Sequence, residues 1–228
     1  MPKTIAVYLE VGAKRVFAGA LDRPGWARSA RDEEAALDAL VAYGSRYRRS
    51  IGRAADDLTL PGSRSSLRVV ERLTGDATTD FGAPGKAPAR DSKPLSAVEL
   101  ERLTEVLRAS WRAFDRAARS ATGTTLTTGP RGGGRALAAI REHVHEADGA
   151  YLRSIGGGFD APPGASADRL VRLQRDALVD AIGSRARGEP PAKPRRTAAL
   201  WTPRYTIRRS AWHALDHAWE VQDRSRPR

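Results

Sequence analysis

Residues 211–224, AWHALDHAWEVQDR, decide how the second half of this chain folds. Ala211, Leu215, Ala218 and Val221 recur there at three- and four-residue spacing, which places them on one face of a helix. We predict that this helix starts after Pro203 and turns its apolar face toward a protein core. The segments before it decide what that core consists of.

Three further amphipathic helices are expected upstream. The first has Ser96 as its N-cap, with Glu99 three residues later completing a capping box, and it ends near Gly123. The second follows the glycine-rich stretch and ends near Ile155, and the third runs from about Ser166 to the glycine–proline stretch at 188–191. Four such helices predict an all-α four-helix bundle over residues 95–228.

The first 74 residues have a different pattern. Residues 5–10 (IAVYLE) and 15–21 (RVFAGAL) predict a β-hairpin, and a third short strand is expected around residues 26–29. Asp32 is a suitable N-cap for a following helix, and the branched residues of 67–73 (LRVVERL) predict a further strand. We therefore predict a small α+β domain over residues 1–74.

Between these regions the composition changes to Gly, Ala, Pro, Asp and Thr with little periodicity, which predicts a linker over residues 75–94. The fold class predicted for the whole chain is α+β: a small N-terminal domain of hairpin, strand and helix, followed by an all-α bundle.

The four histidines of the chain fall in two pairs, one in the second predicted helix and one in the last. His213 and His217 are four residues apart, so both imidazoles lie on one helix face and can reach a single ion. A third ligand from the second helix is His143 or His145. Helical phase favours His143, which flanks the apolar stripe, whereas His145 groups with Arg141, Asp148 and Leu152 on a more outward side. The alternative interpretation of the pair is that both histidines lie on the helix surface and bind no metal.

The stretches EHVHEADGAYLR, residues 142–153, and AWHALDHAWEVQDR resemble the DinB-like superfamily of metal-binding four-helix bundles over about residues 95–225. The resemblance implies that His143, His213 and His217 hold a divalent metal ion, zinc or nickel, with water or substrate in the open position. Some members of the superfamily are thiol-dependent transferases or isomerases, which implies a low-molecular-weight thiol as a small-molecule partner.

The order IAVYLE, hairpin, LDRPGWARS and DEEAALDAL resembles the HicB-like antitoxin-type module over about residues 4–50. The sequence departs from that family at Trp26 and at Ala30, where a glycine is usual. The resemblance implies a protein partner for the N-terminal domain. A DNA-binding helix-turn-helix or ribbon-helix-helix motif is not recognised after it, which argues against a complete antitoxin.

Other residues are weaker candidates for a site. Glu220 and Glu146 each follow a candidate histidine by three residues. Each either accepts a hydrogen bond from a metal-bound histidine, acts as an acid/base group, or is a solvated residue of the helix surface. Asp216 points about 100° away from the histidine pair and is a poor ligand.

Residues 204–209 (RYTIRR) either hold a carboxylate or phosphate of a substrate near the metal or form a solvated basic face. The loop 129–135 (GPRGGGR) is an anion-binding loop or a flexible helix entry.

Composition narrows the possible functions. The chain has no cysteine, so disulfides, cysteine-ligated metals and a cysteine nucleophile are excluded, and any thiol must come with the substrate. The net charge of +12 comes mostly from arginines that are spread along the chain. Because no nucleic-acid-binding motif is recognised beside them, nucleic acid is an unlikely partner. Neither a signal peptide nor a membrane span is recognised, so we expect a cytoplasmic protein with no membrane partner.

Three hypotheses result. The first is a metal-dependent transferase or hydrolase, with catalytic residues unknown. The second is a non-enzymatic regulatory or protein-interaction module whose metal site is structural or vestigial. The third is nucleic-acid binding through the arginines, which predicts that affinity falls steeply with salt.

Overall fold

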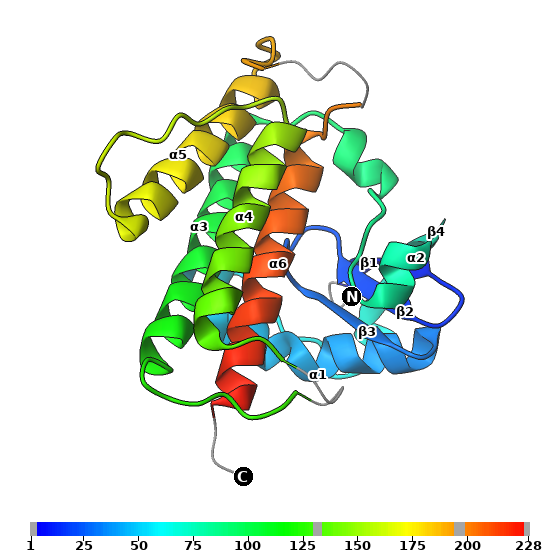
Figure 1. Cartoon of the computed structure of the whole chain (residues 1–228). Coiled ribbons are helices and arrows are strands. Elements are labelled where there is room, and N and C mark those ends of the chain that lie inside the picture. The colour runs from blue at the N-terminus through cyan, green and yellow to red at the C-terminus, as the bar shows by residue number, and fades with distance from the viewer. Residues whose placement is uncertain (1–3, 130–133, 194–198, 226–228) are drawn as a thin grey trace.

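A computed structural model describes residues 4–129, 134–193 and 199–225 (Figure 1). The fold is α+β, as predicted: an N-terminal sheet with a helix against it, followed by a region in which four long helices pack together. In Figure 1 the helices stand side by side, and the sheet with its helix lies against one side of them.

The sheet has four strands in the order β3-β2-β1-β4. They are β1 (Ile5–Val11), β2 (Val16–Ala20), β3 (Ala27–Ala30) and β4 (Leu67–Thr74). β1 and β2 form the predicted antiparallel hairpin, whereas β4 pairs with β1 in parallel. A parallel neighbour needs a crossover connection, and the helix between β3 and β4 lies within it.

That helix, α1 (Glu33–Ile51), begins where the sequence predicts, because the side chain of Asp32 accepts a hydrogen bond from the backbone N–H of Ala35. Its packing centres on Trp26, whose ring stacks on Tyr47 at a centroid distance of 5.5 Å. The indole Nε1 donates to the carbonyl of Leu40, 2.9 Å away. A buried indole with its N–H satisfied joins the β2–β3 connection to α1.

Residues 75–94, the predicted linker, contain a five-residue helix, α2 (Ala77–Phe81), and a 3-10 turn at Ala89–Ser92. The carboxylate of Glu10, fully buried in β1, accepts hydrogen bonds from the Thr79 hydroxyl and from the backbone of residues 85 and 86. A buried carboxylate needs such donors, so this segment is held against the sheet. The division of the chain into domains stays a prediction.

The four long helices are α3 (Ala97–Ser120), α4 (Leu137–Ser154), α5 (Ala167–Ala186) and α6 (Pro203–Arg224). All four contribute to one apolar core, and α6 contacts each of the other three. The capping box predicted at the start of α3 is present. Among the helices of the described residues, none combines the length and the hydrophobicity that crossing a membrane requires.

The N-terminal part and the helical region share a second apolar cluster. Val106 of α3 and both Leu215 and Trp219 of α6 are buried in the same cluster as Trp26. Gly25, with φ at +85°, lies so close to α6 that a Cβ there would come within 2.7 Å of Leu215. The Pro-Gly turn therefore serves as a contact point as well as a turn, and only glycine fits it.

A buried ion pair ties the same two parts together. Arg208 of α6 makes two hydrogen bonds of 2.7 Å to the carboxylate of Asp91. Its remaining N–H groups donate to the carbonyls of Ala20 and Leu21 at the end of β2, both at 2.9 Å. One guanidinium thus links α6, the segment before α3 and the sheet.

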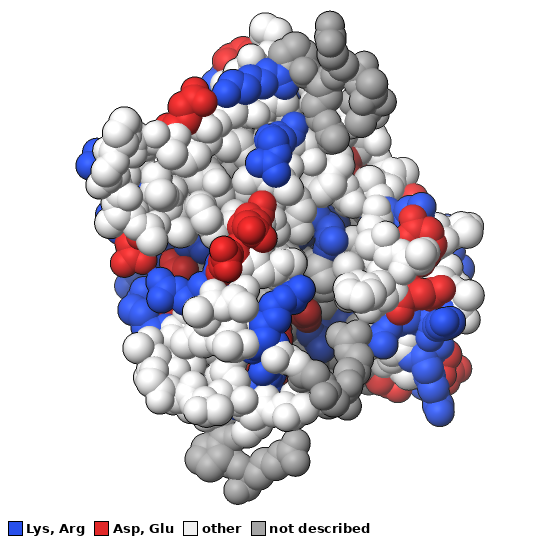
Figure 2. Space-filling view, viewed as in Figure 1, with Lys and Arg blue, Asp and Glu red and all other residues white. Residues whose placement is uncertain are grey.

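Basic and acidic side chains alternate on the face shown in Figure 2. Several basic side chains are also visible in the middle of that face, between the helical region on the left and the N-terminal part on the right (Figure 2). The expectation that nucleic acid is an unlikely partner stays a prediction.

We expect Asp148 to make the stability of the protein depend on pH. Its carboxyl group is only 1% exposed, between α3, α4 and α5. It accepts hydrogen bonds of 3.2 Å from Trp111 Nε1 and from Arg175 Nε. Burial raises the pKa of Asp148 to about 6, although Arg175 acts against this rise. In the unfolded chain the carboxyl titrates near pH 4 (about 3.9).

Between those values the folded protein binds a proton that the unfolded chain has lost. The stability that Asp148 contributes is therefore fully present at low pH and is lost as the pH rises through about 6. We expect the free energy of unfolding of the wild type, relative to Asp148→Asn, to fall by about 2 kcal/mol between about pH 4.5 and 7.5. Urea titrations of both proteins measure this difference, and an equal difference at the two pH values would contradict it.

Candidate metal centre

His143 of α4 and His213 and His217 of α6 come together, with one possible ligand atom of each within 4.8 Å of the others. The Nε2 atoms of His143 and His213 are 3.2 Å apart. The three imidazole rings meet edge to face, with centroid distances of 4.6 to 5.1 Å. These are the three histidines that the sequence predicts as one group.

Local structure explains this convergence. The i, i+4 spacing puts His213 and His217 one turn apart on α6, and α6 packs against α4. On α4, Ile140 and Val144 are fully buried in the core, and His143 lies between them in sequence at the edge of that apolar face. Its ring can therefore reach α6 without entering the core.

The arrangement fits a single metal ion. Two nitrogens bound to one tetrahedral ion at 2.0–2.1 Å are about 3.4 Å apart, close to the distance between the Nε2 atoms of His143 and His213. The three candidate ligand atoms lie within 4.8 Å of one another, so no separation has to shorten by more than about 1.4 Å to reach that of a bound pair. Nδ1 of His213 is buried and has no hydrogen-bond partner among the described residues. Nε2 of His213 lies beside Nε2 of His143, so Nε2 is the atom of this ring that can bind the same ion as a neighbouring imidazole.

Protonation favours ligation by two of the rings. Burial, followed by the charges of His217 and Arg209, holds the pKa of His213 well below its usual value. Burial, followed by His217, also lowers the pKa of His143. Metal ligands must be neutral imidazoles, and these two rings are neutral at neutral pH.

Glu220 orients the third ring. Its carboxylate accepts a hydrogen bond of 2.7 Å from Nδ1 of His217 and one of 2.6 Å from Arg224. This fixes Nε2 of His217 as the free ring nitrogen, as carboxylate partners of metal-bound histidines do. The hydrogen bond with His217 is also the main cause that lowers the pKa of Glu220. Glu146 is exposed on α4 and acts on His143 through its charge only.

His145 lies outside the cluster. Its Nδ1 is 3.1 Å from the side-chain nitrogen of Gln174 on α5. The face of α4 that carries His145 was expected to point outward, and this is wrong for Asp148 and Leu152, which are 1% and 2% exposed. The physical reason is that α5 packs along this face of α4, so the helix is covered on two sides.

Asp216 turns away from the histidines, as the helical phase predicts, and accepts a hydrogen bond of 3.1 Å from Arg28. The loop 129–135 lies partly outside the described residues, because residues 130–133 are not described. Arg135 is described, is exposed, and acts electrostatically on both His143 and His213.

The basic stretch 204–209 divides into two roles. Arg204 binds Glu99 at 2.7 Å and two carbonyls before α3, and Arg208 binds Asp91. Neither is part of a solvated basic face, because both are buried. Of these three arginines, only Arg209 has its guanidinium beside Tyr151 and Trp212, the aromatic neighbours of His213.

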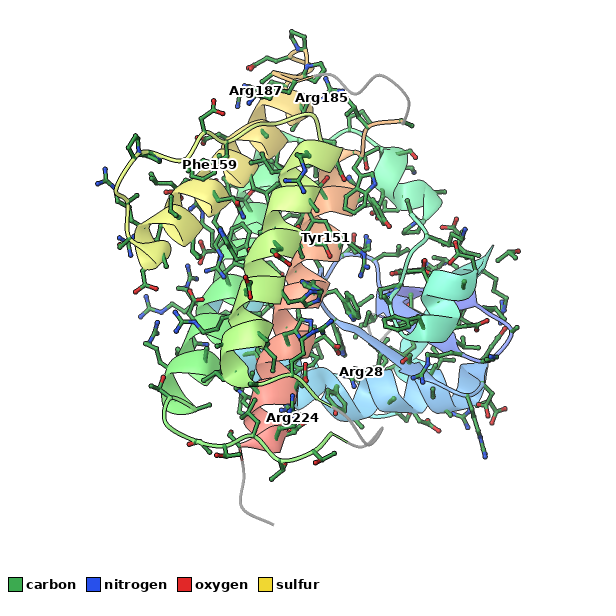
Figure 3. The ribbon with its side chains drawn as sticks, in the orientation of Figure 1. Arg28, Tyr151, Phe159, Arg185, Arg187 and Arg224 are labelled. Atoms are coloured by element: carbon green, nitrogen blue, oxygen red, sulfur yellow. The ribbon has the colours of Figure 1, made fainter. Side chains whose placement is uncertain are left out.

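Tyr151 is a residue of the site that the sequence analysis missed. Its ring lies edge-on to His213 at a centroid distance of 5.9 Å, and in Figure 3 it lies where α4 meets α6. The sequence assigns it to the apolar stripe, and it is indeed buried. The sequence does contain a pattern that could have identified it. Tyr151 follows His143 by two four-residue steps, through Ala147, and this spacing keeps Tyr151 and His143 on one side of α4.

No family model matches this chain, and no match is found among curated proteins or among solved structures.

Proposed function

We propose that this protein binds one divalent metal ion, zinc or nickel, through His143, His213 and His217, and uses it for a transfer or hydrolysis reaction. The observation that carries the proposal is the approach of three imidazoles from two helices, two of them with Nε2 atoms 3.2 Å apart. The motif resemblance to the DinB-like superfamily also supports it.

An ion with three protein ligands keeps a position for water, a thiolate or a substrate oxygen, and supplies Lewis acidity there. The residues of the chain would prepare this position. Glu220 holds the ring of His217 in one orientation. The hydroxyl of Tyr151 makes no hydrogen bond within the described residues, and because burial raises its pKa it keeps its proton and can donate to a bound group.

A thiol is a suitable co-substrate for such a position. The protein has no cysteine of its own, so a thiolate at the metal would have to come from a small molecule. A low-molecular-weight thiol is therefore the partner that we propose for the reaction.

Cobalt substitution tests both parts of the proposal. We expect the full-length protein to bind one equivalent of Co²⁺, and 2-mercaptoethanol to add a saturable thiolate-to-cobalt absorption band. Failure to bind an equivalent of metal would refute the metal site. Stoichiometric binding without a response to the thiol would instead indicate a closed, structural site and favour the regulatory or interaction function.

A further inference from the structure

Arg209 differs from the other two arginines of its stretch, because no carboxylate among the described residues pairs with its charge. Nη1 of Arg209 is buried without a hydrogen-bond partner among the described residues. The flat face of its guanidinium is held by aromatic rings, 4.7 Å from the centroid of Trp212 and 6.0 Å from that of Tyr151. Stacking of this kind uses the face of the group and leaves its N–H edge available for a ligand.

The position of Arg209 connects it to the candidate metal centre. It precedes His213 by four residues on α6, so the two side chains lie one above the other on the same face. Tyr151 contacts both, since its ring also lies edge-on to His213. Arg209 is among the charges that act on the ring of His213.

Positive charge exceeds negative charge around His213, which favours the binding of an anion. Arg209 and Arg135 both act on His213, and a bound dication would add two positive charges. Glu220, the acidic group that is hydrogen-bonded to the cluster, already binds His217 and Arg224. On the other side of Arg209, the cavity bounded by Trp212 and the sheet measures 10 Å³, which is about one water molecule and too small for a ligand. A ligand does not fit there, so we place any ligand of Arg209 on the side of His213, one turn away on α6.

We propose that Arg209, with the hydroxyl of Tyr151, forms a subsite for the carboxylate or phosphate group of a substrate whose reacting atoms lie at the metal. The subsite rests on the proposed function for the role of the metal. Guanidinium binds oxyanions of either kind through paired N–H donors, and Tyr151 supplies a further donor. The substrate class is thus an anionic small molecule.

Calorimetry with small probes tests the subsite. The full-length protein, metal-free and Co²⁺-loaded, is titrated with acetate, with methylphosphonate and with acetamide, the neutral counterpart of acetate. We expect an anion to bind and acetamide not to bind. Arg209→Gln is expected to weaken anion binding about 10- to 100-fold, because a charge-assisted hydrogen-bonding group is lost. The tighter of the two anions identifies the group as carboxylate or phosphate.

Metal affinity separates this role from a structural one. Removing a positive charge near the ion leaves Co²⁺ affinity unchanged or raises it, so Arg209→Gln should bind metal at least as well as the wild type. Arg209→Lys, which keeps the charge and loses the planar donor pair, should weaken the anion less than Arg209→Gln does. Arg153→Gln, on an exposed part of α4, is the matched loss of charge and should leave both affinities unchanged.

Two results would overturn the subsite: equal anion affinity in wild type and Arg209→Gln, or an equal loss in Arg153→Gln. If Co²⁺ binds and neither anion does, the subsite fails while the metal site stands. If Co²⁺ itself does not bind, the proposed function fails, and the metal-free titrations still decide whether Arg209 holds an anion.

Discussion

Replacing His213 with alanine is expected to abolish tight metal binding, with affinity reduced more than 100-fold. Loss of an outer partner of a metal ligand typically costs about 10–100-fold, and the loss of a direct ligand costs more. His213 is the most buried of the three, and its Nε2 lies 3.2 Å from that of His143. Competition with a chromogenic chelator measures the affinity of both proteins for Zn²⁺.

Two further variants rank the contributions within the cluster. Glu220→Gln removes the carboxylate that holds His217, so it should weaken Zn²⁺ by about 10–100-fold without abolishing binding. His145→Ala makes the same substitution at the histidine that faces Gln174, and it should have no effect. If His145→Ala lost the metal and His213→Ala kept it, the assignment of the ligands would be wrong.

Thermal unfolding provides a second measurement for the same set. A ligand that binds only the folded state stabilises it in proportion to the logarithm of its concentration over Kd. We therefore expect saturating Zn²⁺ to raise the Tm of the wild type and of His145→Ala, and to leave that of His213→Ala unchanged. The metal-free Tm values show separately whether the alanine variants fold.

Replacing Asp91 with alanine is expected to lower the free energy of unfolding by about 3–5 kcal/mol, which is the usual cost of removing one partner of a buried ion pair. Asp91 is 1% exposed, and its removal leaves the guanidinium of Arg208 buried with the carbonyls of Ala20 and Leu21 as its only hydrogen-bond partners among the described residues. Urea unfolding followed by tryptophan fluorescence measures the loss.

The chain offers a matched exposed pair as the control. Asp57 binds Arg23 through two hydrogen bonds of 2.7 and 2.9 Å, but the Asp57 side chain is 66% exposed. Asp57→Ala should cost no more than about 1 kcal/mol, because solvent screens the pair. Combining Asp91→Ala with Arg208→Met removes the unpaired charge and should recover part of the lost stability. Similar losses for Asp91→Ala and Asp57→Ala would show that burial is not the cause.

Local patterns were enough to predict most of the secondary structure. The hairpin at its glycine turn, the Asp32 cap and the capping box of Ser96 and Glu99 are all present. Each depends on residues within a few positions of one another, so the sequence contains the whole interaction. The same holds for His213 and His217, whose proximity follows from helix geometry alone.

Contacts between distant segments could not be predicted in this way. The outward face assigned to α4 is wrong because α5 covers it, and nothing within α4 shows where α5 packs. The residues before α3 show no periodicity, yet Glu10 and Arg208 hold them through buried charges. Such partners are separated by more than 70 positions and leave no local pattern.

By itself the sequence determined the α+β class, the approximate extents of the main helices and the proximity of His213 and His217, because periodicity, caps and i, i+4 spacing are local. The packing of α4 against α6 decided that His143, and not His145, lies beside that pair. Tertiary structure decided which charged side chains are free to act. Arg204 and Arg208 are bound within the fold, whereas Arg209 lies beside His213 with a donor that no described residue pairs. That distinction depends on which carboxylates and carbonyls the packing of distant segments brings to each guanidinium, since burial without a partner is costly.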